Sequence, residues 1–142
     1  MRKLLMVTLI LLLFSINIVL AQRATTYHQT FTLSESISSL IVDISYPYEI
    51  EKWDGNAIMV ETNIKMKNIT RQTMDFFINQ GRYKLISTDY VNALKIELAP
   101  MVRKTISTKY GECNEDIHYK VYVPFSLTVN SLGKELVLVS ND

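Results

Sequence analysis

Alternation of apolar and polar side chains is the feature of this chain that most constrains its fold. Residues 58–66 carry apolar side chains at every even position except Thr62, and mostly polar ones at the odd positions. Residues 40–51 and 94–98 contain shorter runs of the same kind. Successive side chains of a β-strand point to opposite faces, so such a run fits a strand with one buried face and one face in water. The sequence therefore predicts a mostly β protein, built as an antiparallel hairpin or sandwich-like unit.

One segment follows a helical pattern instead. Thr70 is a suitable N-cap, and Ile69 before it can pack against Met74 at the fourth helical position. Phe77 continues the apolar stripe one turn later, and Gly81 is a typical C-terminal stop. We therefore expect one short helix between two groups of strands.

Asp54-Gly55 lies between two of the alternating runs and predicts a tight turn. A two-residue loop would set charged side chains against apolar ones on each face, whereas a three-residue loop, Trp53–Gly55, pairs Ile50 with Ile58. The second register is favoured because a slip of one residue moves every side chain to the other face. In that hairpin Gly55 would adopt a positive φ.

The N-terminal sequence predicts export. Two basic residues precede an apolar run from Leu4 to Leu20, and Ala21 supplies a small residue before the expected cleavage point. An uncleaved signal anchor is the alternative, although the run is shorter than the roughly 20 residues that span a bilayer. We expect residues 1–21 to be a cleaved signal peptide. Residues 22–142 would then form a single β-rich domain in the periplasm or on the cell surface, with no stable membrane span.

Composition narrows the possible functions. The 142 residues include 15 Lys and Arg against 14 Asp and Glu, a formal net charge of +1. This near-balance gives no reason to expect nucleic acid or an anionic membrane surface as a partner. A single cysteine, Cys113, excludes an intramolecular disulfide framework and a Cys-rich zinc site. Composition therefore leaves a small globular domain as the expected product.

Three segments carry a resemblance to a known family: Phe31–Leu33, then Leu40–Glu61 with its Trp-Asp-Gly-Asn turn, and Tyr122–Gly133 with its Val-Pro. Together with the signal sequence, they resemble the N-terminal part of exported bacterial adhesin-head-like β-solenoid proteins of unknown function. The resemblance covers most of residues 28–139. It implies a strand–turn–strand unit, a helix, and a further strand that leads into the start of a β-solenoid, of which about one rung is expected here. It implies no catalytic residues.

Candidate chemistry is sparse. Cys113 and His118 are close in sequence, but a metal site needs three or four ligands, and the other histidine, His28, is far away in the chain. Neither a nucleophile motif nor a Gly-rich phosphate loop is present in the sequence. We therefore expect no enzymatic activity, no bound metal and no cofactor. A hydrolase that uses Cys113 is the remaining enzymatic alternative.

Aromatic side chains are the better candidates for binding, because exposed Tyr and Trp can stack on sugar rings or anchor a protein interface. Tyr46 and Tyr48 are expected in the core, on the same face as Ile50. The binding candidates, which lie in or near the predicted strands and turns, are Trp53, Tyr110, Tyr119 and Tyr122.

The sequence suggests two functions. The first is a non-enzymatic, adhesin-like interaction with an envelope protein, with envelope polysaccharide, or with a second copy. Its interaction edge would be the last predicted strand, Leu136, Val137, Leu138 and Val139, paired with a partner or covered by residues 103–116. The alternative is a small periplasmic carrier of an apolar ligand, in which Tyr46, Tyr48, Ile58, Val60 and Ile64 would line a cavity instead of filling a core.

Overall fold

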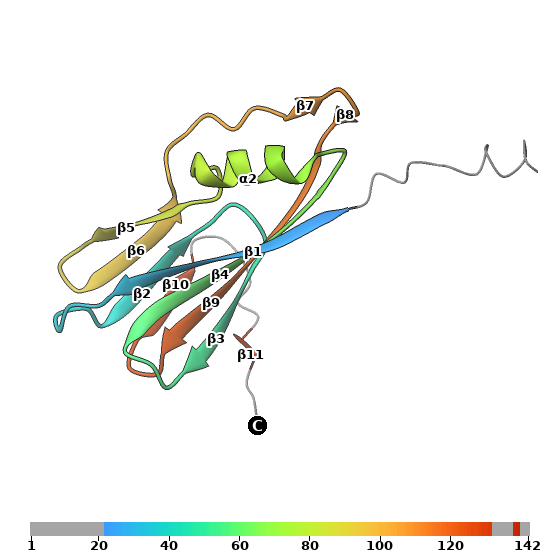
Figure 1. Cartoon of the computed structure of the whole chain (residues 1–142). Helices are drawn as coiled ribbons and strands as arrows, with labels where there is room; N and C mark the ends of the chain where they lie inside the picture. The colour runs from blue at the N-terminus through green and yellow to red at the C-terminus, as the bar shows by residue number, and fades with distance from the viewer. Residues whose placement is uncertain (1–21, 132–137, 140–142) are drawn as a thin grey trace, which may run out of the picture.

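Two β-sheets, one of five strands and one of four, make up most of the computed structural model, which describes residues 22–131 and 138–139 (Figure 1). One helix and a two-stranded ribbon complete the described part. In chain order the elements are β1 Arg23–Thr32, β2 Ser39–Asp43, β3 Tyr48–Trp53, β4 Ala57–Lys67, α2 Arg71–Asn79, β5 Leu85–Asp89, β6 Ala93–Leu98, β7 Ser107–Thr108, β8 Gly111–Glu112, β9 Asn114–Pro124, β10 Thr128–Ser131 and β11 Leu138–Val139. The prediction of a mostly β fold with one short helix is confirmed.

Each sheet contains three neighbouring parallel strands, and the two sets of three follow one another in the same order. The five-stranded sheet runs β1-β4-β9-β3-β11, and the four-stranded sheet runs β10-β2-β6-β5. Strands β9, β3 and β11 are parallel to one another, and so are β6, β2 and β10. Each of the pairs β6/β9, β2/β3 and β10/β11 therefore has one strand in each sheet, and the three pairs stack in the same order. Within the four-stranded sheet, Ser39 of β2 shows this order, because it pairs with Ala93 of β6 on one side and with Thr128 of β10 on the other.

The predicted hairpin between β3 and β4 is wrong. Strand β9 lies between them, parallel to β3 and antiparallel to β4. Ile50 and Val60 therefore both pair with Val121, and Ile50 does not face Ile58 across a hairpin. The physical reason is that β9 presents an apolar inward face and bonds to a strand on each side. A hairpin alone would leave that central strand without its partners.

Gly55 has a different role from the one predicted. Its φ is not positive, unlike the φ of Gly81 and Gly111. The indole ring of Trp53 lies over Gly55 instead, and a Cβ at this position would lie 2.2 Å from Cζ2 of the ring. The indole Nε1 donates a hydrogen bond of 3.1 Å to the carbonyl oxygen of Ala57. Glycine is required here because a side chain would displace the ring.

The predicted helix is confirmed as α2. The hydroxyl of Thr70 accepts a hydrogen bond of 3.2 Å from the N–H of Thr73, as an N-cap should. Gly81 has a φ of +78°, and its N–H donates to the carbonyl oxygen of Ile78 at 2.9 Å. Met74 is fully buried on the inward face. The helix thus has the start, the stop and the buried side chain that its sequence predicts.

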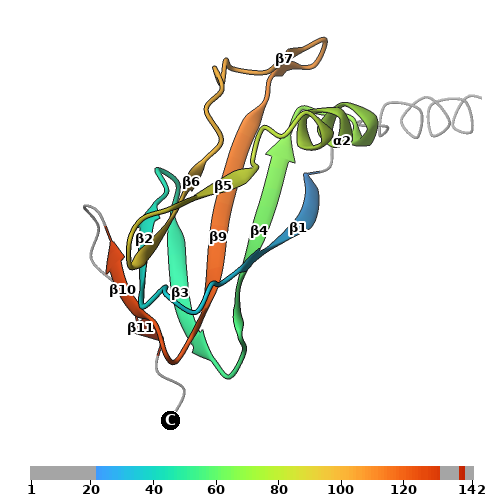
Figure 2. The same cartoon turned by 90° about the vertical axis from the view of Figure 1, so that its left-hand side faces the viewer.

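The core lies between the sheets and under the helix. The helix α2 and β7 are at one end of the molecule, and the turn between β3 and β4 is at the other (Figure 2). The side chains of Ile58, Val60 and Ile64 are fully buried, together with inward residues of β2, β6 and β9. Tyr46 and Tyr48 are partly buried and pack against this core. Within the part of the chain that is described, no helix has the length and apolar character to cross a membrane.

Candidate functional site

Two of the four aromatic candidates come together on the outer face of the five-stranded sheet. The parallel pairing of β3 with β9 places Trp53 beside Tyr122, with ring centroids 6.3 Å apart and planes at 62°. Both side chains are half-buried and face away from the core. An edge-to-face pair of this kind gives a surface with ring faces and polar atoms close together.

Charged side chains surround this aromatic pair. The ammonium of Lys120 lies 2.7 Å from a carboxylate oxygen of Glu51 and 3.9 Å from one of Glu49. It also lies 5.0 Å from the centroid of the Tyr122 ring. The hydrogen bond with Glu51, followed by that with Tyr122, raises the pKa of Lys120 above its ordinary value. We call Trp53, Tyr122 and Lys120, with these two carboxylates, the outer-face site.

The outer-face site can make the contacts that sugars use. Its aromatic rings offer apolar faces, and its ammonium and carboxylates offer donors and acceptors for hydroxyl groups. Two carboxylates face one ammonium, so the site has a net charge of −1 and no excess of cationic charge. A small negative charge of this kind disfavours an anionic ligand and is compatible with a neutral, hydroxyl-rich one.

The other two aromatic candidates lie elsewhere. Tyr119 is fully buried, and its hydroxyl donates a hydrogen bond of 3.2 Å to the carbonyl oxygen of Tyr83. Burial raises the pKa of Tyr119 above its ordinary range. Tyr119 is therefore a core residue, which corrects its selection as a surface contact. Tyr110 is exposed in the turn between β7 and β8, with the ammonium of Lys109 5.0 Å from its ring centroid, at the opposite end from Trp53.

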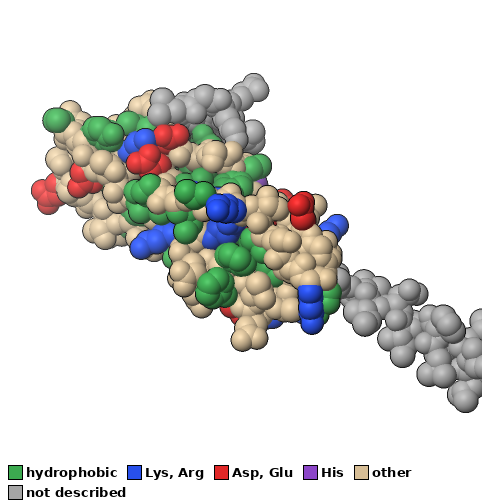
Figure 3. All heavy atoms as spheres, turned by 90° about the horizontal axis from the view of Figure 1, so that it is seen from above, with side chains coloured by type: hydrophobic (Ala, Val, Ile, Leu, Met, Phe, Trp, Pro, Cys, Tyr) green, Lys and Arg blue, Asp and Glu red, His purple; other side chains and the backbone are tan. Residues whose placement is uncertain are grey.

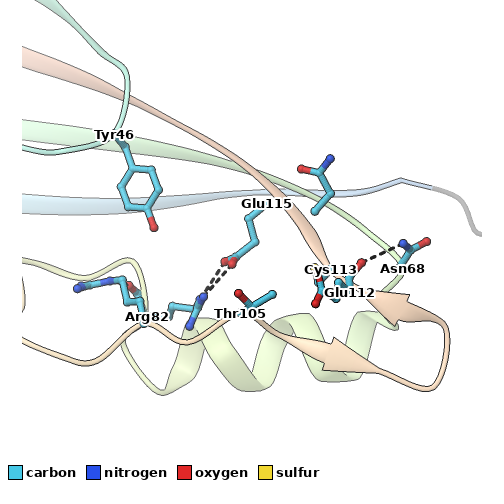
Figure 4. Close-up of a pocket in the computed structure, with 9 residues that line it drawn as sticks. Tyr46, Asn68, Arg82, Thr105, Glu112, Cys113 and Glu115 are labelled. Carbon is cyan, nitrogen blue, oxygen red and sulfur yellow. Dashed lines mark hydrogen bonds and ion pairs between the residues drawn. The ribbon is translucent and has the colours of Figure 1, made fainter.

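A hollow of about 660 Å³ beside α2 contains a polar network that the sequence analysis missed (Figure 4). Arg82 forms two hydrogen bonds with the carboxylate of Glu115, at 2.7 and 2.9 Å, and donates a third of 2.9 Å to the carbonyl oxygen of Lys104. The hydroxyl of Tyr83 also donates to Glu115. The ring of Tyr46 points towards this network. One signal was available in the sequence. Glu115 is an even number of residues from the buried positions of β9, and alternate side chains of a strand share a face, so Glu115 faces inward.

Burial and hydrogen bonding have opposite effects on the pKa of Glu115 in this network. Burial works to raise the pKa of Glu115, but the hydrogen bonds from Arg82 and Tyr83 outweigh it, so the pKa lies below its ordinary value. The hydrogen bond with Glu115 raises the pKa of Arg82, and burial is the main cause of the raised pKa of Tyr83. The network therefore holds an ionised carboxylate against a permanent cation, which is a structural pairing and not a proton-transfer pair.

Cys113 and His118 do not form a joint site. Cys113 is buried on the inward side, whereas His118 lies on the outer face of β9. Burial, and then the charge of Glu115, raises the pKa of the Cys113 thiol, whereas a nucleophilic cysteine needs a lowered one. Among the described residues no group of three or more His, Cys, Asp or Glu side chains is placed to hold a metal ion.

The predicted interaction edge is only partly described. Leu138 and Val139 form β11, which pairs in parallel with Ile50 and Glu51 of β3 at one edge of the five-stranded sheet. Leu136 and Val137 lie outside the described residues. Residues 103–116 do not cover this edge, which corrects that expectation. They run beside α2, where Asn68 donates a hydrogen bond of 3.0 Å to the carbonyl oxygen of Glu112, within that segment.

Comparison with known proteins adds no identity. No family model, no curated protein and no solved structure matches this chain.

Proposed function

We propose that the protein is an exported, non-enzymatic domain of the cell envelope that acts by adding a β-strand partner to an open sheet edge. The observation that carries this proposal is the stack of three strand pairs, β6/β9, β2/β3 and β10/β11, in one order and with parallel pairing in both sheets. Such a stack can grow by one more pair of parallel strands. Growth by repeated layers is how a β-solenoid is built.

The adhesin-like role follows from the same arrangement. In the family that the sequence resembles, stacked rungs continue beyond a unit of this kind. We infer that β10 and β11 begin such a solenoid, and that the layer next to them is supplied by another chain. A second copy is the first partner to test, because it carries strands of matching order. Envelope proteins and polysaccharide are the other partner classes, and the outer-face site is suited to the latter.

The backbone of β10 has groups ready for a partner. The N–H of Thr128 donates to the carbonyl oxygen of Ser38 at 3.0 Å, on the β2 side. Backbone groups of successive strand residues point in opposite directions, so the N–H of Val129 points away from β2. None of the described strands pairs with that side of β10. An unpaired strand edge is a template for strand addition.

Two competing functions have less support. Ile58, Val60 and Ile64, which would line the cavity of an apolar-ligand carrier, pack in the core instead. The hollow beside α2 has a polar wall with an Arg82–Glu115 ion pair, which an apolar ligand would have to desolvate. A hydrolase based on Cys113 would need an accessible thiolate, which the burial of this thiol opposes.

The proposal is tested by the solution mass of the exported protein, measured by light scattering after size exclusion over a range of concentrations. The test variant is Val129→Pro, which removes the outward N–H of β10 and leaves its bonds to β2 in place. The control is Ser87→Pro in β5, which is the edge strand of the four-stranded sheet. The N–H of Tyr90 points towards β6, because it donates to the carbonyl oxygen of Ala93. Ser87 is three residues earlier, so its N–H points the opposite way, out of the sheet.

We expect the wild type and Ser87→Pro to form a defined dimer or larger assembly, and Val129→Pro to shift the mass towards one chain. Circular dichroism establishes that both variants are folded. A wild-type mass of one chain at every concentration, or equal assembly of both variants, would contradict strand addition at the β10 edge.

A further inference from the structure

The near-zero net charge hides a strong separation of charge within the fold. We define the α2 end as Arg23, residues 63–84 and residues 99–116, which include α2, β7 and β8. It carries nine Lys or Arg and four Asp or Glu, a net charge of +5. The remaining described residues carry three Lys or Arg and eight Asp or Glu, a net charge of −5. The α2 end therefore has a positive electrostatic potential and the rest of the described domain a negative one, which the total charge does not show.

Large apolar side chains are exposed on the same end. Phe76 of α2 is 55% exposed, Val102 is 82% exposed, and Met101 and Tyr110 are 40% and 39% exposed. Figure 3, which looks down on this end, shows hydrophobic side chains beside Lys and Arg side chains.

The helix and the neighbouring segment form a groove at the centre of this surface. The groove has a volume of about 310 Å³, and Phe77, Val102 and Ile106 are among its apolar lining. Lys104 lines it as well. The ring of Phe76 contacts that of Phe77, with centroids 5.3 Å apart, so the exposed ring continues the apolar lining outward. Apolar and cationic groups are thus interleaved over one surface.

The path of the chain relates this surface to a membrane. Strand β1 begins at the α2 end, where Arg23 pairs with Met66 and Gln22 lies beside Lys65 and Lys67. The apolar run Leu4–Leu20 comes directly before this point in the sequence. For as long as that run is attached and held in a bilayer, the α2 end is the part of the domain nearest to the bilayer.

We propose that the α2 end docks on the surface of an anionic lipid bilayer. Its Lys and Arg side chains would approach lipid phosphates, and Phe76, Val102, Met101 and Tyr110 would enter the headgroup region, where aromatic and apolar side chains are favoured. The opposite, acidic end would then face away from the bilayer. This orientation leaves the edge of β10 free, so docking and strand addition are independent and can fail separately.

The test uses the exported protein without residues 1–21, because an attached apolar run would bind vesicles by itself. All the contacts that the structure describes lie within residues 22–139, so this form retains them. Flotation measures binding to vesicles of equal parts phosphatidylcholine and phosphatidylglycerol, and to vesicles of phosphatidylcholine alone. We expect binding to the anionic vesicles only, and weaker binding as salt concentration rises.

Matched variants locate the binding surface. Lys104→Gln with Lys109→Gln should weaken binding to anionic vesicles roughly 25-fold, since each surface cation contributes about a factor of five. The control is Thr88→Glu in β5 with Asn92→Asp in the turn between β5 and β6, which changes the net charge equally and lies outside the α2 end. It should retain most of the binding.

The apolar contribution has an equally close control. Phe76→Ser with Val102→Ser should weaken binding about tenfold, by removing apolar area from the lipid contact. Tyr90→Ser with Val91→Ser removes side chains of similar exposure, 53% and 88%, in the turn between β5 and β6, which lies outside the α2 end, and should not weaken binding. Circular dichroism establishes that every variant is folded.

Absence of binding to the anionic vesicles would overturn the proposal, as would equal binding to phosphatidylcholine or equal losses in the control variants. If the α2-end variants instead abolish self-association and no vesicle binding is seen, this surface is an interface between copies and the membrane assignment is wrong.

Discussion

Replacing Arg82 with methionine should destabilise the fold strongly, because it leaves the carboxylate of Glu115 without its cation. The side chains of Arg82 and Glu115 are only 8% and 17% exposed, and the guanidinium donates three hydrogen bonds of 2.7 to 2.9 Å. Removing one partner of a buried pair costs about 3–5 kcal/mol. Since Tyr83 still donates to Glu115, we expect about 3 kcal/mol at neutral pH, near the lower limit.

The loss should depend on pH in a defined direction. In the wild type the pKa of Glu115 lies below its unfolded value, so this stabilisation is present at neutral pH and is lost as pH falls through the folded pKa. In Arg82→Met, burial acts without the guanidinium and raises the pKa of Glu115, so the folded variant takes up a proton as the pH falls. The difference in stability between wild type and variant should therefore shrink in acid.

The assay is urea denaturation followed by the fluorescence of Trp53, the single tryptophan, near neutral pH and again below about pH 4. The double variant Arg82→Met with Glu115→Leu is the control. Replacing both partners with apolar groups should cost less than Arg82→Met alone. A loss below about 1 kcal/mol, or a loss of the same size at both pH values, would refute the account of the pair.

Three further changes probe other contacts. Gln29→Leu should cost about 2 kcal/mol, because the amide of Gln29 forms hydrogen bonds of 2.9 and 2.8 Å with the carbonyl and N–H of Leu85, and it should speed hydrogen exchange at the Leu85 amide. Unchanged exchange would argue against the contact. Gly55→Ala should lower the thermal midpoint and shift the emission of Trp53, since the new Cβ meets the indole ring. The same change in a Trp53→Leu background should cost less, and equal costs would contradict the steric explanation. Cys113 should react with a thiol reagent far more slowly in the folded protein than in urea, given its burial and raised pKa, and comparable rates would show that the thiol is accessible.

The sequence predicted those features that depend on neighbouring residues. The helix was recognisable because the cap at Thr70, the apolar Met74 and the stop at Gly81 act within one short segment. The buried faces of the strands followed from alternation in the same way. Glu115 was the exception. A charged residue is normally expected to face solvent, but the odd-numbered residues of β9 face inward, and Glu115 is one of them.

The arrangement of the strands could not be predicted from such local signals. The turn at Asp54-Gly55 suggested a hairpin, but β9 begins at Asn114 and still comes between β3 and β4. Pairing between distant segments depends on the packing of whole faces, which a single sequence does not display. The outer-face site shows the same limit, since Trp53 and Tyr122 are neighbours only because of that pairing.

The insertion of β9 between β3 and β4 also determines when the domain can become stable. A chain that is made from its N-terminus presents β3 and β4 long before β9, whose last residue is Pro124. Until then the two strands have unpaired edges and exposed apolar faces, so their folding waits for a contact between distant parts of the chain. Such a protein should fold late and slowly, and should depend on factors that keep β3 and β4 from aggregating until β9 has been made.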